Sequence, residues 1–220
     1  MLAIDIGGCS LKLAEFTFNE HGGMELLDYE FVEYPISDSD GDFVRDFSEA
    51  MRTALTGGKF ISRQVRLSLS GQNFFTRLSN LPPVTETRSQ MEQIVEFEAK
   101  QTVPYPMNEV VWDYQLIRHD ATGEDAGTGS EMEALFVAVK EDLLTAIADV
   151  VEDYGKEILS IEVSPTSFFN AARANGIGTD QCDVILNIGG RCANLVFLDK
   201  GRIFTRTIPI AGHAITQQIA

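Results

Sequence analysis

A pair of glycines at the end of a buried strand is the first feature of this sequence suited to phosphate chemistry. The segment Leu2–Ile6 is followed by a turn, and the motif reads Asp5-Ile-Gly-Gly-Cys-Ser10. Glycines let backbone N–H groups approach a phosphate closely, and a serine hydroxyl adds a further donor. A carboxylate at the end of the strand, here Asp5, would hold Mg²⁺ through a water molecule. The motif therefore predicts a phosphate-binding turn.

The same arrangement returns 182 residues further along the chain. Gly189-Gly190 corresponds to Gly7-Gly8, and Asn187 stands where Asp5 stands in the first copy. Both copies share the order strand, turn, strand, turn, strand and helix, which predicts a duplicated unit. Two such turns facing each other would clamp the phosphates of a nucleotide, whereas two plain hairpin turns are the alternative. The candidate phosphate-binding residues are Asp5, Gly7, Gly8, Cys9, Ser10, Lys12, Asn187, Gly189, Gly190, Arg191, Cys192 and Asn194.

Other phosphate-binding and catalytic motifs are absent from the sequence. It contains neither the G-x-x-x-x-G-K-[ST] of a P-loop nor the G-x-G-x-x-G of a dinucleotide-binding fold. The amide of Asn187 keeps the shape of an aspartate but lacks the charge that would order Mg²⁺ or an attacking water. The sequence assigns no catalytic residue, and it disfavours hydrolysis.

The overall charge excludes several classes of partner. The chain has 220 residues, with 17 Lys and Arg against 33 Asp and Glu, for a net charge of −16. Phosphate backbones and anionic lipids both require a cationic surface, so we expect no nucleic acid partner and no direct membrane insertion. Three cysteines without a C-x-x-C pair favour a reducing cytoplasm. We therefore expect a soluble, acidic α/β protein.

The elements that position the two turns follow from hydrophobic periodicity. Alternation predicts strands and a 3.6-residue period predicts helices. The helical spacing also assigns Phe168 to the core. We expect strands over residues 2–6, 11–18, 25–34, 65–69, 76–81, 110–117, 132–139, 158–163, 184–188, 193–198 and 202–210. We expect helices over residues 43–55, 141–154, 164–174 and 212–220. A further helix follows a capping box at Thr87 and Gln90, carries Met91 to Ala99, and is ended by Pro104-Tyr-Pro106.

Four further stretches of sequence are distinctive. Three lie in the middle of the chain and one follows the second turn: Arg77-Leu-Ser-Asn-Leu-Pro-Pro83, Met91-Glu-Gln-Ile-Val-Glu-Phe-Glu-Ala99, Val103-Pro-Tyr-Pro-Met-Asn-Glu-Val-Val-Trp-Asp-Tyr114 and Phe204-Thr-Arg-Thr-Ile-Pro-Ile-Ala-Gly212. The two turns are similar to the phosphate motifs of the actin, Hsp70 and sugar-kinase superfamily. Within that superfamily, the four stretches resemble the PilM family of type IV pilus assembly proteins, relatives of the cell-division protein FtsA.

The resemblance implies an α/β, actin-like (ribonuclease H-like) ATPase fold with a small inserted α+β subdomain. Residues 1–69 and 155–181 would form the first actin-like subdomain, and residues 70–154 the insert. Residues 182–220 would begin a second lobe, which we expect to be truncated. Trp112 and Tyr114 share one face of a strand in the insert, where they line either a partner groove or the core.

The resemblance also implies a function. Proteins of this family are cytoplasmic adaptors that bind the N-terminal tail of the inner-membrane protein PilN, in a groove between the first subdomain and the insert. By this route we expect recruitment to the inner face of the inner membrane, contact with the pilus motor complex, and use of ATP and Mg²⁺ as cofactors. Self-association and service to a related secretion system stay open. The alternative is an active ATPase or phosphotransferase.

Overall fold

The chain forms two compact units in its computed structural model. The larger unit comprises residues 1–73 and 142–220, and the smaller comprises residues 74–141. The smaller unit lies inside the range 70–154 expected for an insert, whereas helix α3 (Glu141–Asp153) belongs almost entirely to the larger unit. The structure describes residues 1–21, 23–36, 39–70, 73–82, 88–118, 132–179, 181–199 and 202–219.

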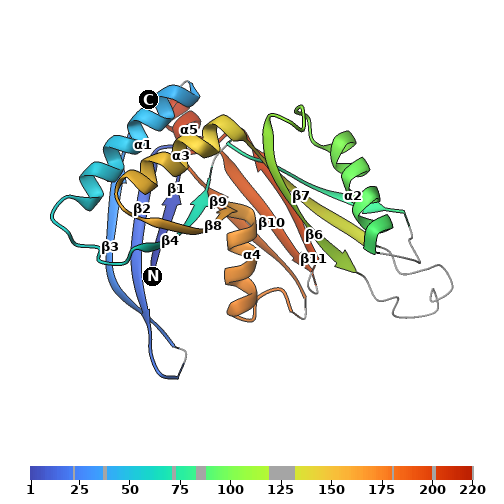
Figure 1. The fold of residues 1–220 in the computed structure, drawn as a ribbon, viewed down its shortest axis with the longest axis horizontal. Helices are drawn as coiled ribbons and strands as arrows, with labels where there is room; N and C mark the ends of the chain where they lie inside the picture. Colours follow the sequence, from blue (N-terminus) through green and yellow to red (C-terminus); the bar gives the residue numbers. More distant parts are fainter. Residues whose placement is uncertain are drawn as a thin grey trace. The chain divides into compact units, whose positions relative to one another are not determined.

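The larger unit is built on a five-stranded mixed sheet, drawn at the blue end of the chain in Figure 1. Its order is β3-β2-β1-β4-β8. The first three strands form an antiparallel meander, and β4 and β8 are added in parallel. The strands are β1 (Leu2–Ile6), β2 (Ser10–Phe18), β3 (Met24–Glu33), β4 (Gln64–Leu69) and β8 (Glu157–Val163).

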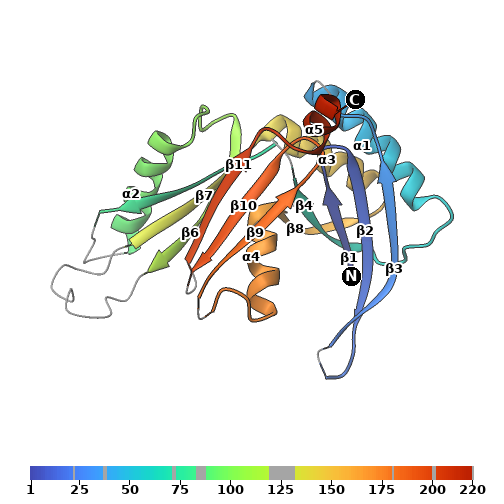
Figure 2. The same ribbon diagram turned by 180° about the vertical axis from the view of Figure 1, so that it is seen from behind.

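One face of this sheet carries the core of the unit. Because side chains alternate across a strand, every second residue of the inner strands is buried. Helix α1 (Asp40–Leu55) begins at Ser39, whose Oγ accepts from the N–H of Asp42 at 3.1 Å, and it packs on β2 and β3. Figures 1 and 2 show α1 and α3 on this face. The buried strand residues are Leu2, Ile4, Ile6, Leu11, Leu13, Val65, Leu67 and Leu69.

A buried carboxylate fixes the connection that leads from α1 into β4. Glu15 of β2 is only 2% exposed, and it accepts hydrogen bonds from the backbone N–H of Ser62 at 2.6 Å and of Ile61 at 3.4 Å. Lys156 donates to the carbonyl of Ser62 at 2.7 Å. Burial raises the pKa of Glu15, but the hydrogen bonds from Ser62 and Ile61 outweigh it, so the pKa lies below its usual value.

A second sheet in the larger unit has the order β11-β10-β9, with both pairs antiparallel. Its strands are β9 (Cys182–Ile188), β10 (Ala193–Asp199) and β11 (Arg202–Ile208). Helix α4 (Ser164–Ala174) contacts β4 and β8 of the first sheet as well as β10 of the second, so it joins the two sheets. Helix α5 (Gly212–Ile219) follows β11.

The smaller unit is an antiparallel sheet in the order β5-β7-β6, together with one helix. Its elements are β5 (Phe75–Leu81), α2 (Arg88–Thr102), β6 (Val110–Arg118) and β7 (Met132–Lys140). Val95 and Ala99 of α2 share a buried cluster with Phe136 of β7. The expected strands and helices of both units are all present; most boundaries shift by at most two residues, and α1 begins three residues earlier than expected, at Asp40.

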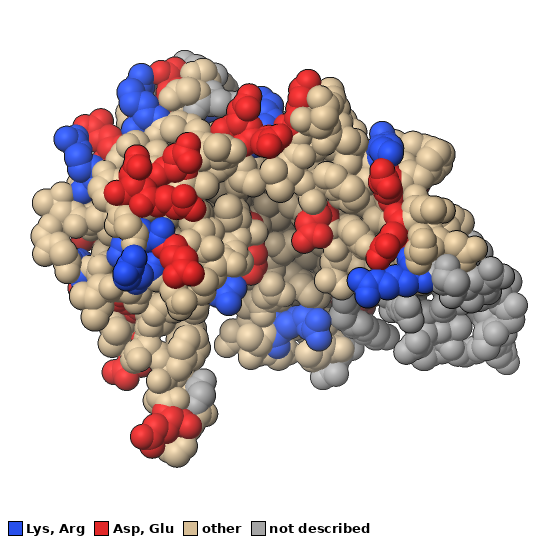
Figure 3. All heavy atoms as spheres, viewed as in Figure 1, with Lys and Arg blue, Asp and Glu red and all other residues tan. Residues whose placement is uncertain are grey.

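The described surface is strongly acidic, as the composition requires. Acidic side chains are spread over the face shown in Figure 3, with basic ones among them. On α1, Arg45 pairs with Asp42, and Arg52 pairs with Glu49, in both cases three residues away on the helix. None of the described helices combines the length and apolar composition needed to cross a bilayer.

Candidate functional site

The first glycine turn joins β1 to β2 and is closed by a short hydrogen bond. The N–H of Gly7 donates to the carbonyl of Ser10 at 2.9 Å. A Cβ at position 7 would lie 2.8 Å from that oxygen, so only glycine fits there. The turn therefore exists because the chain has no side chain at the point where it folds back on itself.

Tyr34 holds this turn in place. Its N–H donates to the carbonyl of Cys9 at 3.0 Å, and its hydroxyl donates to the carbonyl of Gly7 at 2.5 Å. The side chain is buried and its ring meets that of Phe43 edge-on. Burial raises the pKa of the Tyr34 hydroxyl well above its usual value, and the nearby Cys9 and Asp5 add to the effect. The hydroxyl is therefore a fixed donor to the turn.

The second glycine turn, between β9 and β10, repeats this geometry. The N–H of Gly189 donates to the carbonyl of Cys192 at 3.0 Å, and a Cβ on Gly189 would lie 2.8 Å from the same oxygen. The start of α5 holds this turn, because the N–H groups of Gly212 and His213 donate to the carbonyls of Gly189 and Gly190 at 3.0 Å each.

The two turns meet each other. A Cβ added to Gly190 would lie 2.2 Å from the Sγ of Cys9, and one added to Gly8 would lie 3.0 Å from the Cβ of Arg191. Within the described part of the chain, the N–H groups of Gly8, Cys9 and Gly190 have no acceptor. Such amides are available to an anion.

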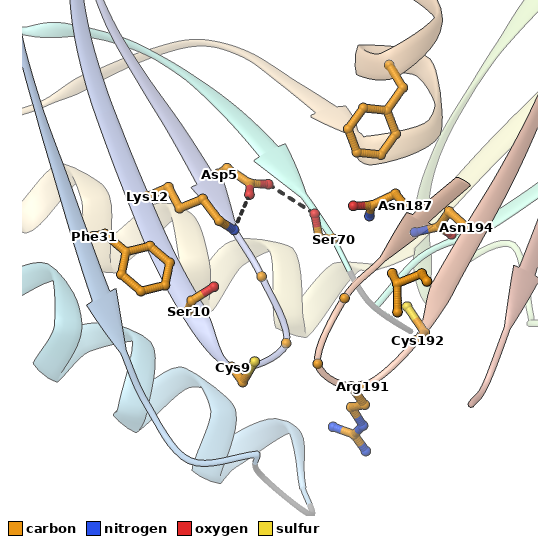
Figure 4. Close-up of a pocket in the computed structure, with 16 residues that line it drawn as sticks. Asp5, Cys9, Ser10, Lys12, Phe31, Ser70, Asn187, Arg191, Cys192 and Asn194 are labelled. Atoms are coloured by element: carbon orange, nitrogen blue, oxygen red, sulfur yellow. Dashed lines mark hydrogen bonds and ion pairs between the residues drawn. The ribbon is translucent and has the colours of Figure 1, made fainter. Parts of the chain in front are cut away.

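The turns enclose a cavity of about 500 Å³, drawn in Figure 4. All twelve candidate phosphate-binding residues from the sequence line it, six from each hairpin. Four further residues join them, namely Phe31, Ser70, Phe168 and Ile188. The structure thus brings the two motifs to one place, and the phosphate-binding role of these residues stays a prediction.

Asp5 is engaged at both of its carboxylate oxygens. One oxygen pairs with the Lys12 ammonium at 2.8 Å, and the other accepts from the Ser70 hydroxyl at 3.0 Å. Figure 4 shows both contacts converging on Asp5. The side chains of Lys12 and Asp5 are 49% and 35% exposed, so the pair is solvent-screened and contributes only about 0.2–1 kcal/mol.

Of the four cavity residues that sequence reasoning missed, Ile188 lies between two candidates, and tertiary packing supplies the other three. Ser70 comes directly after β4, the parallel neighbour of β1, and its N–H donates to the carbonyl of Ile6 at 2.9 Å. Phe31 stands opposite Lys12 in the β2–β3 register. Phe168 was assigned to the core by its helical spacing; it is instead half-buried and lines the cavity. Of these three residues, only Phe31 could have been predicted from the sequence, by pairing the third expected strand with the second and finding the residue opposite Lys12.

The donor set of the cavity does not fit a Mg²⁺ ion held through Asp5. Mg²⁺ is bound through carboxylates and water, and among the described residues Asp5 is the one acid that lines the cavity. Both of its oxygens already have partners, and Asn187 is neutral. The Oδ1 of Asn194 accepts from the Thr207 hydroxyl at 2.9 Å. No group of three or more His, Cys, Asp or Glu able to hold a metal is found among the described residues.

The two aromatic candidates for a partner groove belong to the smaller unit. Trp112 and Tyr114 are half-buried on β6, with ring centroids 6.2 Å apart. Each lies 6.5 Å from the ring of Phe136, centroid to centroid, and both pack against the buried cluster. Both side chains therefore contribute to the core of the smaller unit. The strand that carries them, β6, lies at the edge of its sheet.

Comparison with known proteins agrees with this geometry. The fold that holds the paired turns is the actin-like ATPase fold. One similar structure is a Bacteroides thetaiotaomicron protein with an actin-like ATPase fold and unknown function, with a TM-score of 0.56 and 8% identity over 96% of this chain and 70% of that one. The chain belongs to the type IV pilus assembly protein PilM family, whose model matches residues 3–220. The expected fold and family are therefore confirmed.

Two further structures come from pilus and secretion machines. A chain of the PilM–PilN type IV pilus biogenesis complex superimposes with a TM-score of 0.77 at 19% identity, over 99% of this chain. The present chain spans 64% of the length of that protein. The cytoplasmic domain of EpsL, an inner-membrane component of the Vibrio cholerae type II secretion system, gives a TM-score of 0.52 at 11% identity over 93% of this chain and 70% of that one. At these identities the likeness establishes the fold.

Proposed function

We propose that this protein is a cytoplasmic scaffold of type IV pilus assembly that binds a nucleotide and the N-terminal tail of a PilN-type inner-membrane protein. The observation that carries the nucleotide part is the meeting of two glycine turns around one cavity. Three backbone amides without described acceptors and the Lys12 ammonium supply donors for phosphate oxygens. The proposal is for binding, with no hydrolytic step assigned, because Asn187 offers no carboxylate to orient a water.

Nucleotide binding is tested by titration calorimetry of ATP into the whole chain. We expect a heat of binding that Gly190→Ala reduces, because the added methyl group would collide with Cys9 in the opposite turn. Gly57→Ala is unsuitable as a control because Gly57 has a φ of +95°. Gly41→Ala, which meets only the distant Ser39 Oγ at 4.0 Å, is a suitable one. Absence of any heat from ATP would contradict the nucleotide part.

The partner part is supported by family membership and by the PilM–PilN complex being a structural neighbour. We propose that the tail binds as an added strand along an exposed sheet edge, for which β6 is a candidate. Binding of this kind would recruit the scaffold to the inner face of the inner membrane, next to the pilus motor complex. Self-association is a separate possibility, which analytical ultracentrifugation would test by measuring the mass of the protein in solution.

Trp112 offers a direct readout of partner binding, because it is the single tryptophan of the chain and lies on β6. A tryptophan-free peptide with the N-terminal sequence of the cognate PilN-type protein should change its fluorescence with a saturable dependence on concentration. A scrambled peptide of equal charge is the control. If neither Trp112 fluorescence nor the anisotropy of a labelled peptide changes, the partner part is wrong.

A further inference from the structure

The two hairpins differ at the pair of residues that faces the cavity. In the first hairpin, Asp5 of β1 stands directly opposite Lys12 of β2. In the second, Asn187 of β9 stands directly opposite Asn194 of β10. A charged pair in one copy thus corresponds to a neutral amide pair in the other. Among the described residues the cavity lining holds one carboxylate, and that carboxylate is paired with an ammonium.

Two basic side chains, Lys12 and Arg191, are among the described residues that line the cavity. An ammonium has three donors, and Lys12 gives one of them to Asp5, so two remain for phosphate oxygens. Arg191 also lines the cavity and extends from the tip of the second turn, away from the Asp5–Lys12 pair (Figure 4). The described lining thus has two basic side chains and one acidic one, in a protein whose net charge is −16.

We propose that this cavity binds phosphate groups as free anions, without a divalent cation, and that Lys12 supplies the positive charge that Mg²⁺ would otherwise bring. Asp5 is then the counter-ion of the Lys12 ammonium and the acceptor of the Ser70 hydroxyl, rather than an acid that holds Mg²⁺. This inference rests on the proposed nucleotide binding and specifies its chemistry. The ligand class is a di- or triphosphate, with ATP as the probe.

The two roles of Asp5 predict opposite effects of one substitution. Asp5→Asn preserves the size of the side chain and an oxygen that accepts from Ser70, but it removes a negative charge from beside the phosphates. If Asp5 holds a metal, this change weakens binding. If Asp5 is only the counter-ion of Lys12, its replacement removes a competitor for the ammonium, and ATP binds as tightly as before or more tightly.

The experiment is calorimetry of ATP with the whole chain, in a buffer containing EDTA and in one containing MgCl₂. We expect dissociation constants that agree within about threefold between the buffers, and no weakening by Asp5→Asn in either. Lys12→Met should weaken binding by about tenfold or more, because charge-assisted hydrogen bonds are lost. Lys12→Arg should restore most of the affinity. Circular dichroism of each variant checks that it is folded.

Lys100→Met is the matched control, because Lys100 forms a comparable exposed ion pair with Glu96 at 2.7 Å on α2 and does not line the cavity. It should bind ATP as the unaltered chain does. Binding that requires MgCl₂, or that Asp5→Asn weakens tenfold, would overturn the metal-free inference and leave nucleotide binding standing. Absence of binding in both buffers would overturn both.

Discussion

Removing one buried hydroxyl should separate the contribution of Tyr34 from the rest of the first turn. In Tyr34→Phe the ring and its contact with Phe43 remain, and only the hydrogen bond to the carbonyl of Gly7 is lost. Gly7 is itself buried, so water does not replace the lost donor readily. The expected effect is therefore the cost of a buried carbonyl without its partner.

That cost is about 1–3 kcal/mol of the free energy of unfolding. For a domain of 150–250 residues it corresponds to a lowering of Tm by roughly 2–12 °C. Urea unfolding followed by far-ultraviolet circular dichroism measures it at pH 8. Tyr29→Phe is the matched control, because Tyr29 lies on the neighbouring strand β3 and is 67% exposed. We expect that control to change stability by less than about 0.5 kcal/mol.

The pH dependence provides a second signature of the same hydroxyl. Tyrosines of the unfolded chain ionise near pH 10, whereas burial raises the pKa of Tyr34 above that value in the folded state. The contribution of Tyr34 is therefore fully present below about pH 10 and is lost as the pH rises above it. The stability difference between the unaltered chain and Tyr34→Phe should accordingly narrow between pH 9 and 11.

Two results would refute this reasoning. An unchanged urea midpoint for Tyr34→Phe would mean that the Gly7 carbonyl does not depend on the hydroxyl. A stability difference that stays constant above pH 10 would mean that Tyr34 ionises as readily when folded as when unfolded. Equal losses for Tyr34→Phe and Tyr29→Phe would also contradict a specific role for the buried hydroxyl.

Three further changes test other parts of the structure. Glu15→Gln should lower the free energy of unfolding by about 1–3 kcal/mol at pH 7. Because the pKa of Glu15 in the folded state lies below its usual value, this loss should become smaller as the pH falls below about 4.5. Urea titrations at pH 7 and pH 4 would measure it. Gly190→Ala should lower the free energy of unfolding by about 1–3 kcal/mol through overpacking. Adding Cys9→Ala should restore part of that stability, since the Sγ of Cys9 is the atom nearest to the added methyl group. Equal melting temperatures for the single and double variants would contradict this. Phe136→Ala should destabilise the smaller unit by about 3–5 kcal/mol, reported by Trp112 fluorescence, and an unchanged urea midpoint would contradict its place in that core.

Local sequence patterns were sufficient for the elements of this fold. Leu2, Ile4 and Ile6 alternate with less buried residues, and such alternation followed by a glycine turn predicts a β-strand. The glycine turns themselves are also local, because their closing hydrogen bonds span only three residues. The twelve residues around the cavity could be predicted because they lie within a few positions of those turns, in two copies that share one order of elements.

Contacts between distant segments could not be predicted in the same way. The parallel pairing of β1 with β4 brings Ser70 to Asp5 across 65 residues, and nothing near either residue encodes that register. The packing of α4 likewise decides that Phe168 lines a cavity, although its spacing is that of a core residue. Helix α3 belongs to the larger unit because of its tertiary contacts, which local sequence does not encode.

The amino-acid sequence alone thus determined the strands, the helices and the two glycine turns, because short-range sterics and alternation act between neighbours in the chain. Its motifs also carried the family resemblance. Only the tertiary structure decided that the two turns touch at Cys9 and Gly190, and that both oxygens of Asp5 are taken by Lys12 and Ser70. Such contacts depend on how sheets and helices that are distant in the chain pack together. Because of them, Asp5, which the sequence predicted to hold Mg²⁺, is instead the counter-ion of Lys12 in the proposed site.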